Sequence, residues 1–407
     1  MSDFLGNIDI AFFAIPLAKI VILTLMMILP SVAYSVMIER RLSAVMQDRV
    51  GPNRTGLPLT LFGFKKDFHL WGMLQPMADG LKFFLKEDFT PKGVNTFYFW
   101  LAPALTFVPA MLTCAVVPFT SELDFSFLGL AHPVKGVIAD LNVGPLFTFA
   151  IASLGVYGIV LAGWSSNSKY PFLGGVRASS QMISYEMSLG LSIIPVLLIC
   201  GDLNLSKISA FQDADGWMLL PLWGKGVPWA NGWHWADLSF ARWVLWVPLF
   251  ISFVVFVISM FAETNRLPFD MAECETELVA GYHTEYSSMK FALFFMGEYA
   301  AMIIGSGMAV TLFLGGWSIP FGPTISYYLG IQMHYIAGHT PLYLGILHVL
   351  TFAFKVLLFI MFFVVIRWSI PRFRYDQLMK LGWLYLFEIA LFNVLLTAVL
   401  MIFFPLH

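Results

Sequence analysis

Carboxylates gather in one short stretch of the sequence, FAETNRLPFDMAECETELVAGYHTEY, which runs from Phe261 to Tyr286. Six of the 25 acidic residues of the chain lie in this stretch: Glu263, Asp270, Glu273, Glu275, Glu277 and Glu285. Carboxyl groups this close together repel one another when all are ionised, so some should hold protons near neutral pH. The stretch therefore predicts a proton-handling site, with a solvated acidic loop as the alternative.

The rest of the chain is too apolar for a soluble protein. Hydrophobic residues make up 59% of it and charged residues 12%, where about 25% charged is typical of soluble domains. Eight apolar stretches have the roughly 20 residues that a membrane-spanning helix needs. They lie near residues 10–38, 97–120, 141–167, 178–201, 243–262, 291–315, 342–366 and 381–404. The sequence thus predicts an all-α integral membrane protein, with residues 1–407 forming a single polytopic domain.

The basic residues predict how this domain is oriented. Seventeen of the 23 Lys and Arg residues lie in alternate connections between the spans, and four lie in the opposite set. Because connections rich in Lys and Arg stay on the cytoplasmic side, both termini are expected on the outer, periplasmic side. The acidic loop, residues 263–290, is then expected on the inner side.

Three glutamates fall inside or at the end of predicted spans, namely Glu186, Glu263 and Glu298. A charge at the centre of a bilayer costs about 3 kcal/mol on insertion scales, so such residues usually face other helices or water and often mark ion paths. We expect these three to form one proton relay in the inner half of the membrane. For Glu388 and Lys19, snorkelling or a structural pair is the simpler interpretation.

Apolar residues at helical spacing near residues 70–89 predict an amphipathic helix that lies in the membrane interface. It could be a plain surface anchor or the lip of an opening for a lipid-soluble ligand. The three cysteines, Cys114, Cys200 and Cys274, are far apart and predict neither an iron–sulfur cluster nor a disulfide framework. With no glycine-rich nucleotide motif either, any electrons must come from another chain.

Four segments of the sequence resemble a known family: the acidic stretch with FALFFMGEYA after it, ERRLSAVMQDRVGPNRTG, LQPMADGLKFFLKE and PRFRYDQLM. Their order and the eight spans are similar to those of the H subunits of proton-pumping NADH–quinone oxidoreductase, or respiratory complex I, and of their mitochondrial counterpart, NADH dehydrogenase subunit one. The resemblance covers nearly the whole chain. It departs from the family at Leu57–Gly72, Asp202–Arg242 and Ser318–Pro341, which are longer than usual.

The resemblance implies roles for individual residues. The quinone chamber and its entrance would involve Arg40, Arg49, Asp270, Glu273, Glu275, Glu277 and Glu285. The proton route would comprise Glu186, Glu263 and Glu298, with Asp79 nearby. Arg372 and Arg374, with Asp376 beside them, would dock another subunit on the inner side. No residue is expected to bind a metal.

The resemblance also implies partners. The chain would belong to an NADH:quinone oxidoreductase in a bacterial inner membrane, with ubiquinone or menaquinone as substrate and no redox centre of its own. FMN and iron–sulfur clusters would be on peripheral-arm subunits, and antiporter-like subunits would adjoin it in the membrane; no nucleic acid is involved. Two alternatives remain open from the residues alone: the related membrane subunit of an ion-pumping hydrogenase, and a stand-alone transporter.

Overall fold

Eight helices long and apolar enough to cross a membrane are present in the part of the chain that the structure describes. This computed structural model describes residues 10–56, 71–124, 133–221, 240–271, 278–335 and 340–404. In chain order the spans are the continuous α2 (Ile10–Ile20), η1 (Val21–Ile28) and α3 (Leu29–Met46); α5 (Thr96–Leu112) with η3 (Thr113–Val116); α6 (Gly144–Ser165); α7 (Lys169–Cys200); α11 (Phe240–Glu263); α13 (Ser288–Phe313); α15 (Leu342–Ser369); and α16 (Tyr375–Lys380), η7 (Leu381–Leu386) and α17 (Phe387–Phe403). The structure is mostly helical, and the prediction of eight helices that could span a membrane is confirmed.

Several of these helices extend beyond the stretches predicted from hydropathy. The fourth span begins at Lys169 rather than at residue 178, and the first ends at Met46 rather than at residue 38. Backbone hydrogen bonding continues through polar residues as readily as through apolar ones, whereas hydropathy detects only the part of a helix that matches the hydrocarbon layer. The extensions matter because one of them carries Glu39 and Arg40 on the regular helix α3.

Shorter elements connect the spans. They are α4 (Gln75–Leu85), α8 (Leu205–Asp215), η6 (Gly281–His283), α14 (Gly322–Leu329) and a small antiparallel hairpin of β1 (Thr120–Leu123) and β2 (Val134–Gly136), which the sequence did not predict. Helix α4 falls within the stretch predicted to be amphipathic, and its Met77, Leu81, Phe84 and Leu85 are exposed. Its position in the membrane interface stays a prediction.

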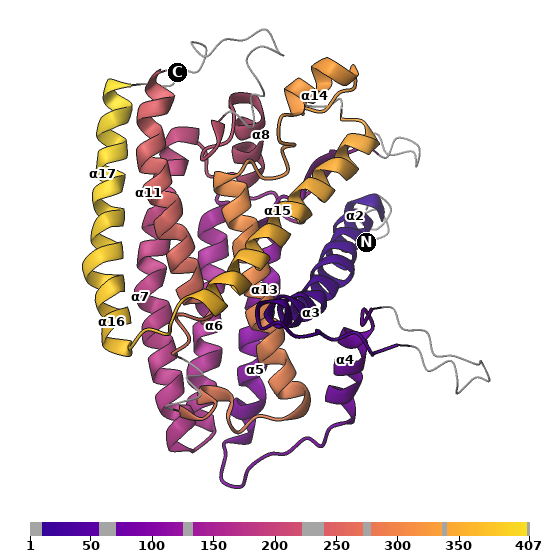
Figure 1. Cartoon of the computed structure of the whole chain (residues 1–407), viewed down its shortest axis with the longest axis vertical. Helices are drawn as coiled ribbons and strands as arrows, with labels where there is room; N and C mark the ends of the chain where they lie inside the picture. The colour runs from indigo at the N-terminus through magenta and orange to yellow at the C-terminus, as the bar shows by residue number, and fades with distance from the viewer. Residues whose placement is uncertain are drawn as a thin grey trace, which may run out of the picture.

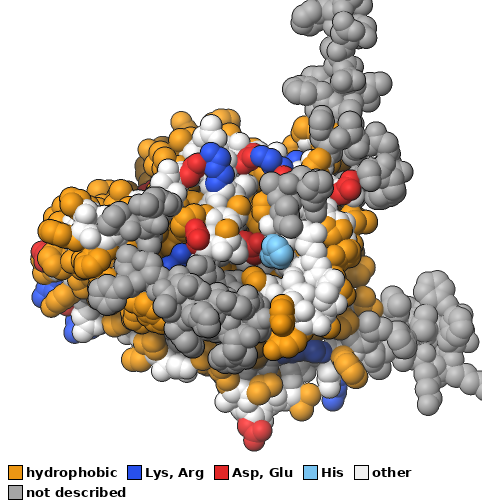
Figure 2. All heavy atoms as spheres, turned by 90° about the horizontal axis from the view of Figure 1, so that it is seen from above, with side chains coloured by type: hydrophobic (Ala, Val, Ile, Leu, Met, Phe, Trp, Pro, Cys, Tyr) orange, Lys and Arg blue, Asp and Glu red, His pale blue; other side chains and the backbone are white. Residues whose placement is uncertain are grey.

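The helices form a bundle with α13 near its middle and the first and last spans at its edges (Figure 1). We call the end of the bundle where α3 ends and α13 begins the α4 end, and the opposite end the α8 end. Helix α17 ends toward the α8 end (Figure 1). A view onto that end shows hydrophobic side chains around much of the rim, with charged side chains in the upper middle and at parts of the edge (Figure 2).

Helices α5 and α6 pack closely at Gly158. A Cβ atom added there would lie 2.8 Å from the backbone nitrogen of Thr106 and 2.9 Å from the carbonyl oxygen of Ala102. We expect Gly158→Ala to destabilise the protein by about 1–3 kcal/mol, because backbone atoms cannot yield to overpacking as a flexible side chain would. Gly155→Ala, on the same helix, is the matched control, since no heavy atom of the described residues lies within 4 Å of its added Cβ. The measurement is the temperature at which the purified protein unfolds; equal temperatures for the two variants would refute this account of the packing.

Candidate functional site

A cavity of about 610 Å³ opens at the α4 end between α3, α13 and α15. We call it the α3 cavity. It is lined by Arg40 and Arg49, which the family resemblance assigns to the quinone chamber and its entrance. Glu39, Tyr299 and Arg367 line it as well. Its wall thus combines charged groups with aromatic rings at the edge of the bundle.

Glu39 is the centre of a buried network in the wall of the α3 cavity. Its side chain is largely buried, and Arg367 at the end of α15 bonds to its Oε1. The hydroxyl of Tyr299 donates to its Oε2 at 2.6 Å, and Nη1 of Arg266 lies 3.2 Å from the same oxygen. Two cations and a phenol therefore hold one carboxylate, which offsets the cost of taking it out of water.

Arg266 extends this network into the bundle. Its Nε lies 2.6 Å from Oε1 of Glu298 on α13, and its guanidinium carbon lies 4.1 Å from the centre of the Tyr299 ring. The side chain is only 9% exposed, so its charge is satisfied by these neighbours rather than by water. One buried guanidinium thus joins Glu39 to Glu298.

A second cavity, of about 110 Å³, lies inside the bundle between α5, α6, α7, α11 and α13. We call it the relay cavity. Glu263 and Glu298 both line it, and so do the hydroxyl-bearing residues Thr106, Thr113 and Thr148. A space of this size with several polar groups in its wall has room for ordered water. Carboxyls and water together form an arrangement through which protons can move.

Of the two other residues assigned to the proton route, one lies near this cavity. Glu186 on α7 accepts a hydrogen bond from Ser153 on α6 and interacts electrostatically with Glu263. Asp79 on α4 instead pairs with Arg40, with 2.7 Å between its Oδ2 and Nη1 of the arginine. The structure therefore groups Glu186, Glu263 and Glu298 and places Asp79 beside the α3 cavity.

Comparison with known proteins gives the family. The sequence profile of the family described as NADH dehydrogenase matches residues 18–398. The chain belongs to this family.

Curated relatives of the chain are named as H subunits of NADH-quinone oxidoreductase. The one numbered 2 in Koribacter versatilis is 40% identical over 401 residues, which is 97% of this chain and 98% of the relative. The one numbered 1 in Geobacter metallireducens is 42% identical over 384 residues, or 94% and 95% of the two chains. The H subunit of Salinibacter ruber is 42% identical over 369 residues, or 90% and 91%. The resemblance predicted from the sequence segments is confirmed.

The acidic loop of this NADH dehydrogenase family member is described only in part. Glu273, Glu275 and Glu277 lie outside the described residues. Asp270 is buried and pairs at 2.8 Å with Arg372. Arg372, assigned to docking, thereby ties the start of the loop to the connection between α15 and α16.

The end of the acidic loop packs into the bundle. Glu285 is half-buried, and the nearby His283 is buried against Phe291 and Phe295. Burial lowers the pKa of His283 to about 4, so its ring is neutral at physiological pH. His283 is therefore not the proton-handling group that the sequence predicts in this loop, and that prediction rests on the carboxyls.

The two remaining docking candidates of this family member are exposed enough to meet a partner. Nε of Arg374 and Oδ1 of Asp376 are 3.8 Å apart, and the two side chains are 82% and 67% exposed. An exposed pair of this kind contributes about 0–1 kcal/mol to stability. Its contribution to the fold is therefore small, which suits a surface that binds another chain.

Four residues of the network are not among the site residues that the sequence predicts: Glu39, Arg266, Tyr299 and Arg367. The position of Glu39 directly after an apolar span and before two arginines is a signal for a membrane-edge ion pair. Arg266 is distinctive in the sequence only as the one arginine among the acids. Tyr299 and Arg367 carry no local signal.

Proposed function

We propose that the chain is the membrane subunit of a proton-translocating NADH:quinone oxidoreductase that forms the quinone chamber and couples quinone reduction to proton movement. One observation carries this proposal. The contacts from Glu39 through Arg266 to Glu298 join the α3 cavity, which is open at the edge of the bundle, to the relay cavity between the helices. An event in the first cavity can thus act on a carboxyl in the second.

In this proposal the α4 end faces the cytoplasm of a bacterium, since it carries most of the Lys and Arg residues. Both termini are periplasmic, and residues 1–407 form one domain in the inner membrane. The exposed apolar side chains of α4 lie in the membrane interface, where the helix forms the lip of the α3 cavity. The names of the relatives support a place in a larger oxidoreductase. FMN and iron–sulfur clusters would be on the peripheral-arm subunits, and antiporter-like subunits would adjoin this one in the membrane.

Quinone enters the α3 cavity from the lipid and is reduced by a cluster on a neighbouring subunit. Reduction places negative charge in the cavity before protons arrive, and at low dielectric that charge acts over several ångströms. It competes with Glu39 for the cations Arg266 and Arg367. A weaker hold of Arg266 on Glu298 raises the proton affinity of that carboxyl.

The proton that Glu298 takes up then passes along the carboxyls at the relay cavity. Glu263 shares the cavity with Glu298, and Glu186 lies beyond it toward the surface formed by α6 and α7. Asp270, Glu273, Glu275, Glu277 and Glu285 would adjust the charge below the chamber and supply protons to it. This chain binds the quinone and couples the reaction; the electrons travel on its partners.

The chamber is tested by filling it. Ala44 lines the α3 cavity, whereas its neighbour Val45 is 74% exposed. We expect Ala44→Trp to raise the KM for quinone about tenfold or more, because an indole removes space that the quinone needs. NADH oxidation by ferricyanide, which needs only the peripheral arm, should be unchanged. Val45→Trp should behave as the wild type, and a normal KM in an assembled Ala44→Trp complex would place the chamber elsewhere.

A further inference from the structure

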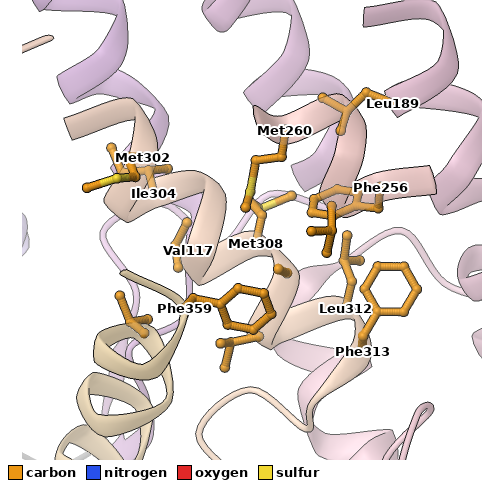
Figure 3. Packing of buried hydrophobic residues seen from close by; sticks show 14 of the residues in the cluster. Val117, Leu189, Phe256, Met260, Met302, Ile304, Met308, Leu312, Phe313 and Phe359 are labelled. Atoms are coloured by element: carbon orange, nitrogen blue, oxygen red, sulfur yellow. The ribbon is translucent and has the colours of Figure 1, made fainter. Parts of the chain in front are cut away.

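A layer of buried apolar side chains lies on the side of the relay cavity that faces the α8 end. Phe256 of α11 and Met308 of α13 line the cavity. One turn beyond Met308, Leu312 and Phe313 are completely buried, and Phe359 of α15 is 8% exposed. Figure 3 shows these five side chains converging from the three helices. We call them the apolar layer.

The aromatic rings of this layer pack closely. The ring centres of Phe256 and Phe313 are 5.5 Å apart. Phe253 connects Phe313 to Phe359, with ring-centre distances of 5.4 and 6.3 Å. Thr311 lies at the same level of α13, but its hydroxyl donates to the carbonyl oxygen of Gly307 at 2.7 Å and is engaged with the helix itself.

Polar groups resume directly beyond the layer. Lys355, one turn from Phe359 toward the α8 end, donates from Nζ to the carbonyl oxygens of Leu314, Gly316 and Ser318 at 2.8, 2.9 and 2.7 Å. From α8, Nε2 of Gln212 donates to the carbonyl oxygen of Thr311 at 2.7 Å. The layer therefore separates two polar regions of one bundle.

The position of the layer between two polar regions affects how protons can move through the bundle. Protons cross a membrane protein along chains of water and polar groups, and a charge in a purely apolar region is strongly disfavoured. We propose that the apolar layer is a proton seal, which prevents protons in the relay cavity from leaking to the α8 end and confines them to the sideways route past Glu186. This inference rests on the proposed relay.

The seal is tested with the intact complex in sealed vesicles and without NADH. A pH gradient is imposed, and its decay is followed with a trapped fluorescent dye. Phe313→Ser should speed the decay about tenfold, which corresponds to a barrier lowered by about 1.4 kcal/mol. Phe313→Leu, which keeps the layer apolar, should decay at the wild-type rate. Phe354→Ser, on the same helix α15 but 60% exposed, is the matched control and should also leave the rate unchanged.

An assembled Phe313→Ser complex with a wild-type decay rate would overturn the proposal. Phe256→Ser tests the same layer from α11 if Phe313→Ser does not assemble. A density map of the unmodified complex provides a check that needs no variant, because ordered water running from Met308 to Lys355 would also overturn it. The leak assay uses no turnover, so it separates a failed seal from a failed relay. If the seal is wrong, Phe313→Ser shows the wild-type decay rate. If the relay is wrong, Glu263→Gln pumps protons normally, whatever the leak rate.

Discussion

Replacing Arg266 by leucine is expected to lower the amount of intact complex to a small part of the wild-type amount. Arg266 is buried and lies 2.6 Å from Glu298 and 3.2 Å from Glu39. Without it, Glu298 loses this cation, and the carboxylate of Glu39 keeps its ion pair with Arg367 but loses the one with Arg266. Removing one partner of a buried ion pair costs about 3–5 kcal/mol, against a total stability of about 5–15 kcal/mol for a typical domain.

The amount of intact complex on native gels, and the temperature at which it dissociates, measure this effect. Arg374→Leu is the control, since it makes the same change in a side chain that is 82% exposed and whose ion pair is worth about 0–1 kcal/mol. Arg266→Lys should give an intermediate result, because one ammonium keeps the charge but lacks the fork that serves two carboxylates. Wild-type amounts of an equally stable Arg266→Leu complex would show that the network does not hold the bundle together.

The membrane fold was predictable because hydropathy and span length are local properties of the sequence. Each span could be recognised from about 20 neighbouring residues without any knowledge of its partners. The boundaries were less accurate where a helix continues into water, as α7 does at Lys169. The hairpin of β1 and β2 was missed because its strands have only four and three residues.

The site was predictable only in part, since its parts differ in how local their signals are. Glu186, Glu263 and Glu298 stood out because acids are rare at membrane depth. The contact of Arg266 with Glu39 joins residues 227 positions apart, and that of Tyr299 with Glu39 joins residues 260 positions apart. Such contacts depend on how α3 and α13 meet the segment that follows α11. No local pattern in one sequence reveals them, and the same is true of the pair formed by Arg40 and Asp79.

The relay makes the second large prediction. Glu263→Gln should sharply reduce proton translocation in a complex that assembles normally, since glutamine has nearly the shape of glutamate but cannot release a proton. A positioned proton-transfer group contributes about 10²–10⁴-fold to the rate of its step, so the remaining glutamates should sustain only a small part of the coupled flux. Quinone reduction should slow as well. In the proposed coupling, protons must leave the relay cavity after each reduction, and Glu263→Gln blocks that step.

The number of protons translocated per NADH oxidised, measured in sealed vesicles with the Glu263→Gln complex, tests this account most directly. Glu388→Gln provides the matched control, because Glu388 on α17 is exposed on the surface of the bundle. The account predicts a ratio several-fold below that of the wild type for Glu263→Gln and an unchanged ratio for Glu388→Gln. A wild-type ratio in a fully assembled Glu263→Gln complex would contradict it.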